Sequence, residues 1–131
     1  MAILDGDNIF DEDVANTAIG TYATEVLDLG AAHVGYNQKV IIDITTAFAT
    51  SASGTVTFNL LTSASSAMSS TTTLWTSGAI AAASLTAGKT YEITLPYEVL
   101  RYVEVQEVIA TGALSGGAFT AYVDSARQVN L

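Results

Sequence analysis

Six segments of the chain alternate apolar and polar residues at every second position. In residues 55–61, for example, Val56, Phe58 and Leu60 alternate with Thr and Asn. Successive side chains of a strand point to opposite faces, so a period of two predicts a strand with one buried face. The six predicted strands are residues 24–29, 38–48, 55–61, 89–96, 101–110 and 117–123.

The segments between these strands are short and rich in small residues, such as ATSASG, SASSAMSSTTT and GALSGG. None carries a sustained apolar stripe with the 3.6-residue period of a helix, although residues 79–85 suit a single helical turn. Pro96 ends the fourth strand because proline cannot donate a ladder hydrogen bond. Short strands separated by Gly and Ser turns predict an all-β protein, an antiparallel sandwich or barrel.

The composition fits one domain with one core, since half of the 131 residues are apolar. The chain has no cysteine, which excludes disulfides and thiolate metal sites. We expect an acidic N-terminal arm over residues 1–20 and a β-sandwich domain over residues 21–131. The start carries no signal-peptide pattern, and no segment approaches the roughly 18 apolar residues of a membrane span. A soluble protein made in the cytosol, with no membrane partner, is the expectation.

The formal charge is −9, from 13 acids against four Lys and Arg residues. A field of this sign repels phosphate, whereas nucleic-acid binding depends on Lys and Arg that displace counterions. We therefore expect no nucleic-acid partner.

The acids are densest in the stretch DGDNIFDED, which we tested as a calcium loop. Counted from Asp5, an EF-hand loop would need an oxygen ligand at position 5 and a glycine at position 6. Ile9 and Phe10 occupy these two positions, and Asn16 stands where the bidentate Glu should be. The pattern fails, so we expect no metal site and no cofactor, and the apolar pair inside the acidic stretch becomes the feature of interest.

The sequence shows no recognisable group of catalytic residues. His33 is the only histidine, and Ser115 in GALSGG lacks the glycine two residues before it that a nucleophile elbow requires. We interpret GALSGG as a hairpin turn. Glu104 and Glu107 lie three apart on one predicted strand, which sends them to opposite faces. We expect no enzyme.

Exposed aromatic side chains would favour a different class, a carbohydrate-binding β-sandwich module of a virion or cell surface. The chain has one Trp and six Tyr, but strands favour aromatics in core and cross-strand positions anyway. Trp75, between Thr and Ser residues, is the aromatic most suspected of exposure, although a core position is favoured.

Two stretches, NIFDEDVANTAIGTYATEVLDLG near the start and RYVEVQEVIATGALSGGAFTAYV near the end, together resemble a known family. The chain is similar to the capsid cement, or decoration, proteins of tailed bacteriophages, of the small jelly-roll type first described in a Bordetella podophage. The matching positions are Phe10, Asp11, Asp28, Leu29, Gly30, Arg101 and Tyr102. The resemblance covers nearly the whole length and implies a jelly-roll-like β-sandwich with an extended N-terminal arm.

The resemblance implies a structural virion protein that binds the major capsid protein on the outer surface of the shell and stabilises the DNA-filled head. A homodimer or a homotrimer would each fit such a part. The expected capsid or oligomer interface consists of Ile9, Phe10, Asp11, Glu12, Asp13, Trp75 and Arg101. Phe10 would enter a pocket and the acids would face basic residues of the capsid. Alternatively, Phe10 closes the core of the sandwich itself.

Overall fold

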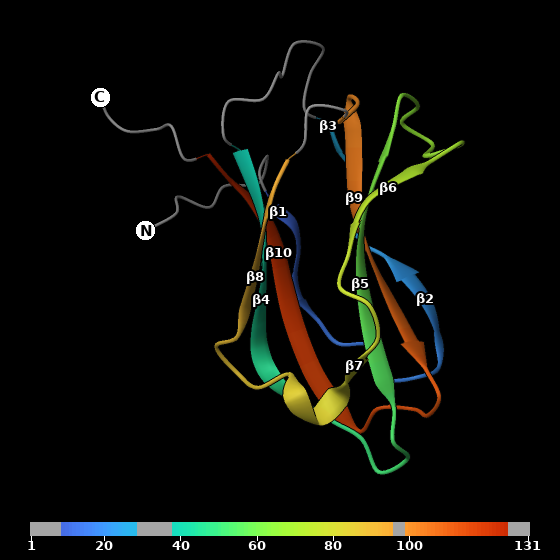
Figure 1. Cartoon of the computed structure of the whole chain (residues 1–131), viewed down its shortest axis with the longest axis vertical. Helices are drawn as coiled ribbons and strands as arrows, with labels where there is room; N and C mark the ends of the chain where they lie inside the picture. The colour runs from blue at the N-terminus through green and yellow to red at the C-terminus, as the bar shows by residue number, and fades with distance from the viewer. Residues whose placement is uncertain (1–8, 29–37, 96–98, 126–131) are drawn as a thin grey trace.

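Two antiparallel sheets packed face to face make up the protein (Figure 1). The structure is a computed structural model that describes residues 9–28, 38–95 and 99–125. Its elements are β1 (Ile9–Val14), β2 (Gly20–Ala23), β3 (Leu27–Asp28), β4 (Gln38–Ala49), β5 (Thr55–Ser63), β6 (Thr72–Thr76), β7 (Ile80–Ala81), the 3₁₀ turn η1 (Ala82–Ser84), β8 (Thr90–Thr94), β9 (Tyr102–Ala110) and β10 (Gly116–Ser125). The predicted all-β sandwich is confirmed.

The strand order shows that the chain changes sheets repeatedly. One sheet has the order β1-β10-β4-β8, and the other has the order β2-β9-β5-β6, with β3 added to β9 and β7 added to β5. β4 and β5 follow each other in the chain but lie in different sheets, and so do β9 and β10. The GALSGG segment therefore joins two sheets, and our interpretation of it as a hairpin turn was wrong.

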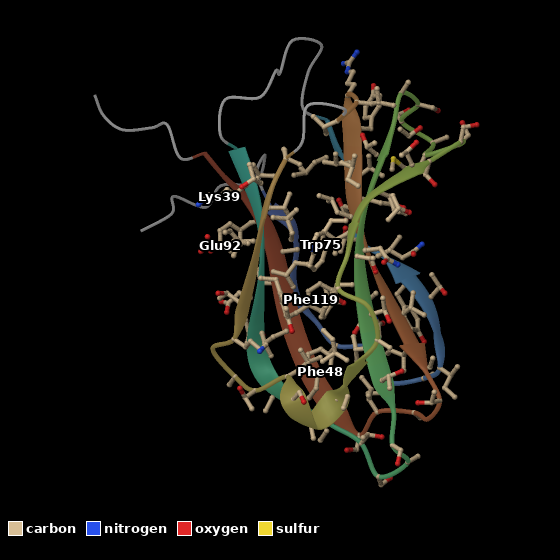
Figure 2. All side chains as sticks on the ribbon, viewed as in Figure 1. Lys39, Phe48, Trp75, Glu92 and Phe119 are labelled. Carbon is tan, nitrogen blue, oxygen red and sulfur yellow. The ribbon has the colours of Figure 1, made fainter. Side chains whose placement is uncertain are left out.

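The core lies between the sheets and is built from the alternating positions of the long central strands. Val40, Ile42 and Ile44 of β4 face Val56, Phe58 and Leu60 of β5 across the sandwich, and all six are fully buried. Phe58 contacts three aromatic rings on strands of the opposite sheet. The centroid distances are 6.4 Å to Phe48, 5.0 Å to Phe119 and 6.2 Å to Tyr91. Figure 2 shows Phe48 and Phe119 in the space between the sheets.

One end of the sandwich depends on a close backbone approach between the β4–β5 and β9–β10 connections. A Cβ atom placed on Gly112 would overlap the carbonyl oxygen of Ala52, and one placed on Gly54 would overlap the carbonyl oxygen of Gly112. Thr50 ties the same connections together, since its hydroxyl donates to the Ala113 carbonyl at 2.7 Å. Glycine is therefore required at both positions, because any side chain would overlap the neighbouring backbone.

We expect Gly112→Ala to lower the free energy of unfolding by about 1–3 kcal/mol, because backbone atoms must move to admit the methyl group. Urea unfolding followed by circular dichroism measures the loss. Gly116→Ala is the matched control, since a Cβ atom there meets nothing within 4 Å. Equal stability of the two variants would contradict the prediction.

Candidate functional site

The predicted anchor segment is an edge strand of the sandwich. β1 pairs antiparallel with β10, with Ile9 opposite Tyr122, Asp11 opposite Ala121 and Val14 opposite Phe119, and the register shifts twice along the way. Within the part of the chain that the structure describes, the other edge of β1 is unpaired. Residues 9–14 of the expected arm therefore belong to a sheet. The side chains of Ile9, Phe10, Asp11, Glu12 and Asp13 lie outside the described part of the structure.

Trp75 lies on the side of the sandwich opposite to β1. It lies on β6 opposite Leu60 of β5, is half-buried, and packs against the core. Its ring centroid is 6.1 Å from that of Tyr91 on β8, with the planes tilted by 50°. The two aromatics bridge the edges of both sheets, and Figure 2 shows Trp75 between them. This matches the favoured core position better than the suspected exposure.

Arg101 lies just before β9 and is exposed. Its guanidinium carbon is 5.2 Å from the centroid of the Tyr102 ring, within the range of a cation–π interaction. β1 and β6 end different sheets, at opposite ends of the two strand orders. The strand orders therefore place β1 and Trp75 on opposite sides of the sandwich.

The most unusual polar group of the described residues is Glu107 on β9. It shares the inward face of the strand with Val103, Val105 and Ile109, and only 1% of its surface is exposed. Asn16 Nδ2, from the β1–β2 connection, donates to Glu107 Oε1 at 3.0 Å. The second carboxylate oxygen, Oε2, is buried and has no hydrogen-bond partner.

Burial raises the pKa of Glu107 to about 7, although the Asn16 hydrogen bond acts in the opposite direction. The neutral form is favoured because an ionised carboxylate loses its hydration inside the core and finds no cation there. Glu104, on the opposite face of the same strand, is also buried, and burial raises its pKa too. The prediction that the two carboxylates lie on opposite faces agrees with the register, in which Glu104 pairs with Leu61 and Glu107 pairs with Phe58, three positions further along the ladder.

In the sequence, Glu107 occupies the same face of its strand as three apolar residues, and nothing nearby in the chain explains a carboxyl group at that position. Asn16 was considered only as a failed calcium ligand, and its partner is 91 positions away in the chain. A polar residue at a core-facing position of a strand was the available signal.

A shallow hollow of about 370 Å³ opens at the glycine-dependent end of the sandwich. Its lining includes Thr50, Ser51 and Ser53 and the alanines 81–83. The Thr50 hydroxyl accepts hydrogen bonds from the Ala52 and Gly54 amides at 3.1 and 3.0 Å, so it serves the fold. The hollow has no charged lining residue and offers no acid, base or nucleophile pair.

Over residues 9–28, 38–95 and 99–125, no cluster of three or more His, Asp or Glu side chains could hold a metal ion. His33 falls outside these ranges. No helix in the same residues is long and apolar enough to span a membrane.

Comparison with protein families supplies the assignment. The sequence model of the Bbp16 family, a Bordetella phage protein family, matches residues 11–123. The chain belongs to the Bbp16 family. The match begins within β1 and ends within β10, so it includes part of these two strands and every described element between them. Of the resemblance seen in the sequence, the relation to a Bordetella phage protein is confirmed.

Two further comparisons add little to the Bbp16 assignment. A search of curated proteins returns no match. Among solved structures, the crystal structure of PirA is similar, with a TM-score of 0.49 and 16% sequence identity over 86% of this chain and 94% of that chain. The likeness is too distant to bear on function.

Proposed function

We propose that this Bbp16 family member is a capsid cement protein, which binds the outer surface of the major capsid protein shell and stabilises the DNA-filled head. The observation that carries the proposal is the family match over residues 11–123. We further propose that the chain is made in the host cytoplasm, assembles as a homodimer or homotrimer, and catalyses no reaction.

Charge supports a position outside the shell. The formal charge of −9 produces a field that repels packaged DNA, so the favourable side of the shell is the outer one. Part of this charge lies on β1, where Asp11, Glu12 and Asp13 follow one another at a sheet edge that has no neighbour among the described residues. A basic capsid surface is the complementary partner.

The sandwich also suits a mechanical part. Its core packs the rings of Phe48, Phe58 and Phe119 among branched aliphatic side chains, which gives a densely packed and stiff body. Many copies bound in symmetric positions multiply weak contacts into strong attachment, without any single strong site.

Quantitative mass spectrometry of gradient-purified particles tests the proposal. We expect hundreds of copies per particle, at a simple fixed ratio to the major capsid protein. A handful of copies would instead identify a tail or fibre component, and absence from particles would refute the proposal. Light scattering of the purified chain at micromolar concentration tests self-assembly, and a monomer would exclude both oligomers.

Phe10 is the proposed anchor of β1. We expect Phe10→Ala to reduce occupancy on capsids at least tenfold, because a buried aromatic anchor is typically worth more than 1.4 kcal/mol at an interface. Occupancy is measured by adding the variant to particles stripped of the protein. Ile19→Ala removes an apolar side chain that is 60% exposed and serves as the matched control. Unchanged occupancy with a lowered melting temperature would assign Phe10 to the core of the sandwich instead.

The carbohydrate-binding alternative requires several exposed aromatics on one face. Trp75, Tyr22, Tyr91, Tyr102 and Tyr122 are all half-buried, and Trp75 and Tyr91 pack on each other at a tilt rather than as one platform. No described observation favours this alternative over the capsid role. A glycan array measures it directly.

A further inference from the structure

A single connection carries the N-terminal chain across one side of the sandwich. β1 lies at the edge of one sheet and β2 at the edge of the other, so residues 15–19 must pass between them. Figure 1 shows this crossing in blue, next to β10 and β9. Each of the two strands has one neighbour in its sheet, β10 for β1 and β9 for β2.

Few hydrogen bonds hold the crossing in place. Asn16 Nδ2 donates to Glu107 Oε1 at 3.0 Å, and the Leu114 amide donates to the Thr17 carbonyl at 2.8 Å. β2 adds only four residue pairs with β9, and β1 pairs with β10 through two register shifts. This segment therefore lies at the periphery of the described sandwich between two edge strands, and such segments open before the central strands do.

Glu107 lies beneath the crossing, and among the described residues no cation contacts its carboxyl group. Tyr22 of β2 and Phe58 of β5 pair with it across the sheet. Tyr22 is titratable, but its hydroxyl donates to the Ala18 carbonyl at 2.8 Å. From the other sheet, Val14 and Phe119 pack against the core.

The described cations interact elsewhere. Lys39 pairs with Glu92 at 3.4 Å, Lys89 lies over Tyr91, and Arg101 lies over Tyr102. Ionisation of Glu107 therefore gains no partner while the crossing is closed.

We infer that Glu107 and Asn16 form a proton-controlled latch, in which the neutral carboxyl keeps residues 14–23 closed on the sandwich and the ionised carboxylate drives them open. On ionisation the proton leaves Glu107 Oε2 for solvent, and the carboxylate left behind is hydrated only when the crossing moves away. The pKa of Glu107, raised to about 7 by burial, puts this change near neutral pH.

The latch does not depend on the capsid role. Its consequence for attachment does rest on the proposed function, because β1 carries Ile9 and Phe10 and would be released together with the crossing.

Amide hydrogen exchange of the purified protein tests the latch without any capsid. We expect the protection of residues 14–23, corrected for intrinsic exchange rates, to fall by a few tens of fold between pH 5 and pH 8. The central strands β4 and β5 should keep their protection over the same range. A flat profile in residues 14–23, or an equal fall in all strands, would overturn the proposal.

Glu107→Gln keeps the size and polarity of the side chain but cannot ionise, so the variant should lose the pH dependence. Glu104→Gln is the matched control, because Glu104 is a buried carboxyl on the opposite face of β9, and it should leave the dependence intact. Retained pH dependence in Glu107→Gln would refute the latch.

Carbon NMR of the wild-type carboxyl groups keeps the proposal testable should Glu107→Gln fail to fold. We expect Glu107 to titrate together with the change in exchange, and titration of Glu107 near pH 4.5 would refute the latch. A capsid with unchanged affinity at both pH values would contradict only the link to attachment.

Discussion

Replacing Phe58 by Ala is expected to lower the free energy of unfolding by about 3–5 kcal/mol, among the largest effects of any single substitution in this chain. Phe58 is fully buried on β5, and its ring contacts Phe48, Phe119 and Tyr91, which belong to three strands of the opposite sheet. Truncation removes these contacts together and leaves a cavity between the sheets that the rigid strands cannot fill by moving.

Urea unfolding followed by tryptophan fluorescence measures the loss, because Trp75 packs against the same core through Tyr91. Tyr102→Ala is the control, since it removes an aromatic ring of similar size that is only half-buried. We expect the control to cost about 1 kcal/mol. Similar losses in the two variants would mean that Phe58 does not join the sheets.

The long strands could be predicted from the sequence because one face of each packs in the core. The central strands β4, β5, β9 and β10 and the edge strand β8 all overlap segments in which the sequence alternates. In each of these strands one set of side chains enters the core, and burial of that set enforces the period of two. The predicted helical turn in residues 79–85 also appears, as η1.

The remaining edge strands and the shortest strands were not predicted, for physical reasons. β6 is mostly Thr and is exposed or half-buried throughout, so its pattern has no apolar face to reveal it. β7 has two residues, and β1 contains two register shifts that interrupt any alternation. β2 begins at Gly20 and precedes the segment that was read as the first strand, of which only Leu27–Asp28 forms β3.

The candidate site could be predicted in part. Alternation alone put Glu107 on the face of β9 that carries Val103, Val105 and Ile109, and the structure buries all four. What covers the carboxyl could not be predicted, because the crossing of residues 15–19 depends on which sheet each edge strand joins. Trp75 was proposed as an interface residue from its polar neighbours and Arg101 from the family resemblance, and no local pattern relates their positions to β1.

Between pH 4 and pH 8, the wild type is expected to lose about 3 kcal/mol more of its free energy of unfolding than the Glu107→Gln variant. In the folded protein burial raises the pKa of Glu107 to about 7, against an ordinary value of 4.5. The folded state therefore holds a proton that the unfolded state releases between these two values. The stability contributed by this proton is fully present below pH 4.5, declines as the pH rises, and is lost above pH 7.

Chemical denaturation of both proteins at pH 4 and pH 8 measures the effect as the difference between their free energies of unfolding. We expect the wild type to lose about 3 kcal/mol more than Glu107→Gln over this interval, since a difference between the ordinary and the folded pKa converts at 1.36 kcal/mol per pH unit. Other acids titrate in both proteins and cancel in the comparison. Parallel pH profiles would show that Glu107 is hydrated in the folded state, and the buried, half-satisfied carboxyl would then not be a source of pH sensitivity.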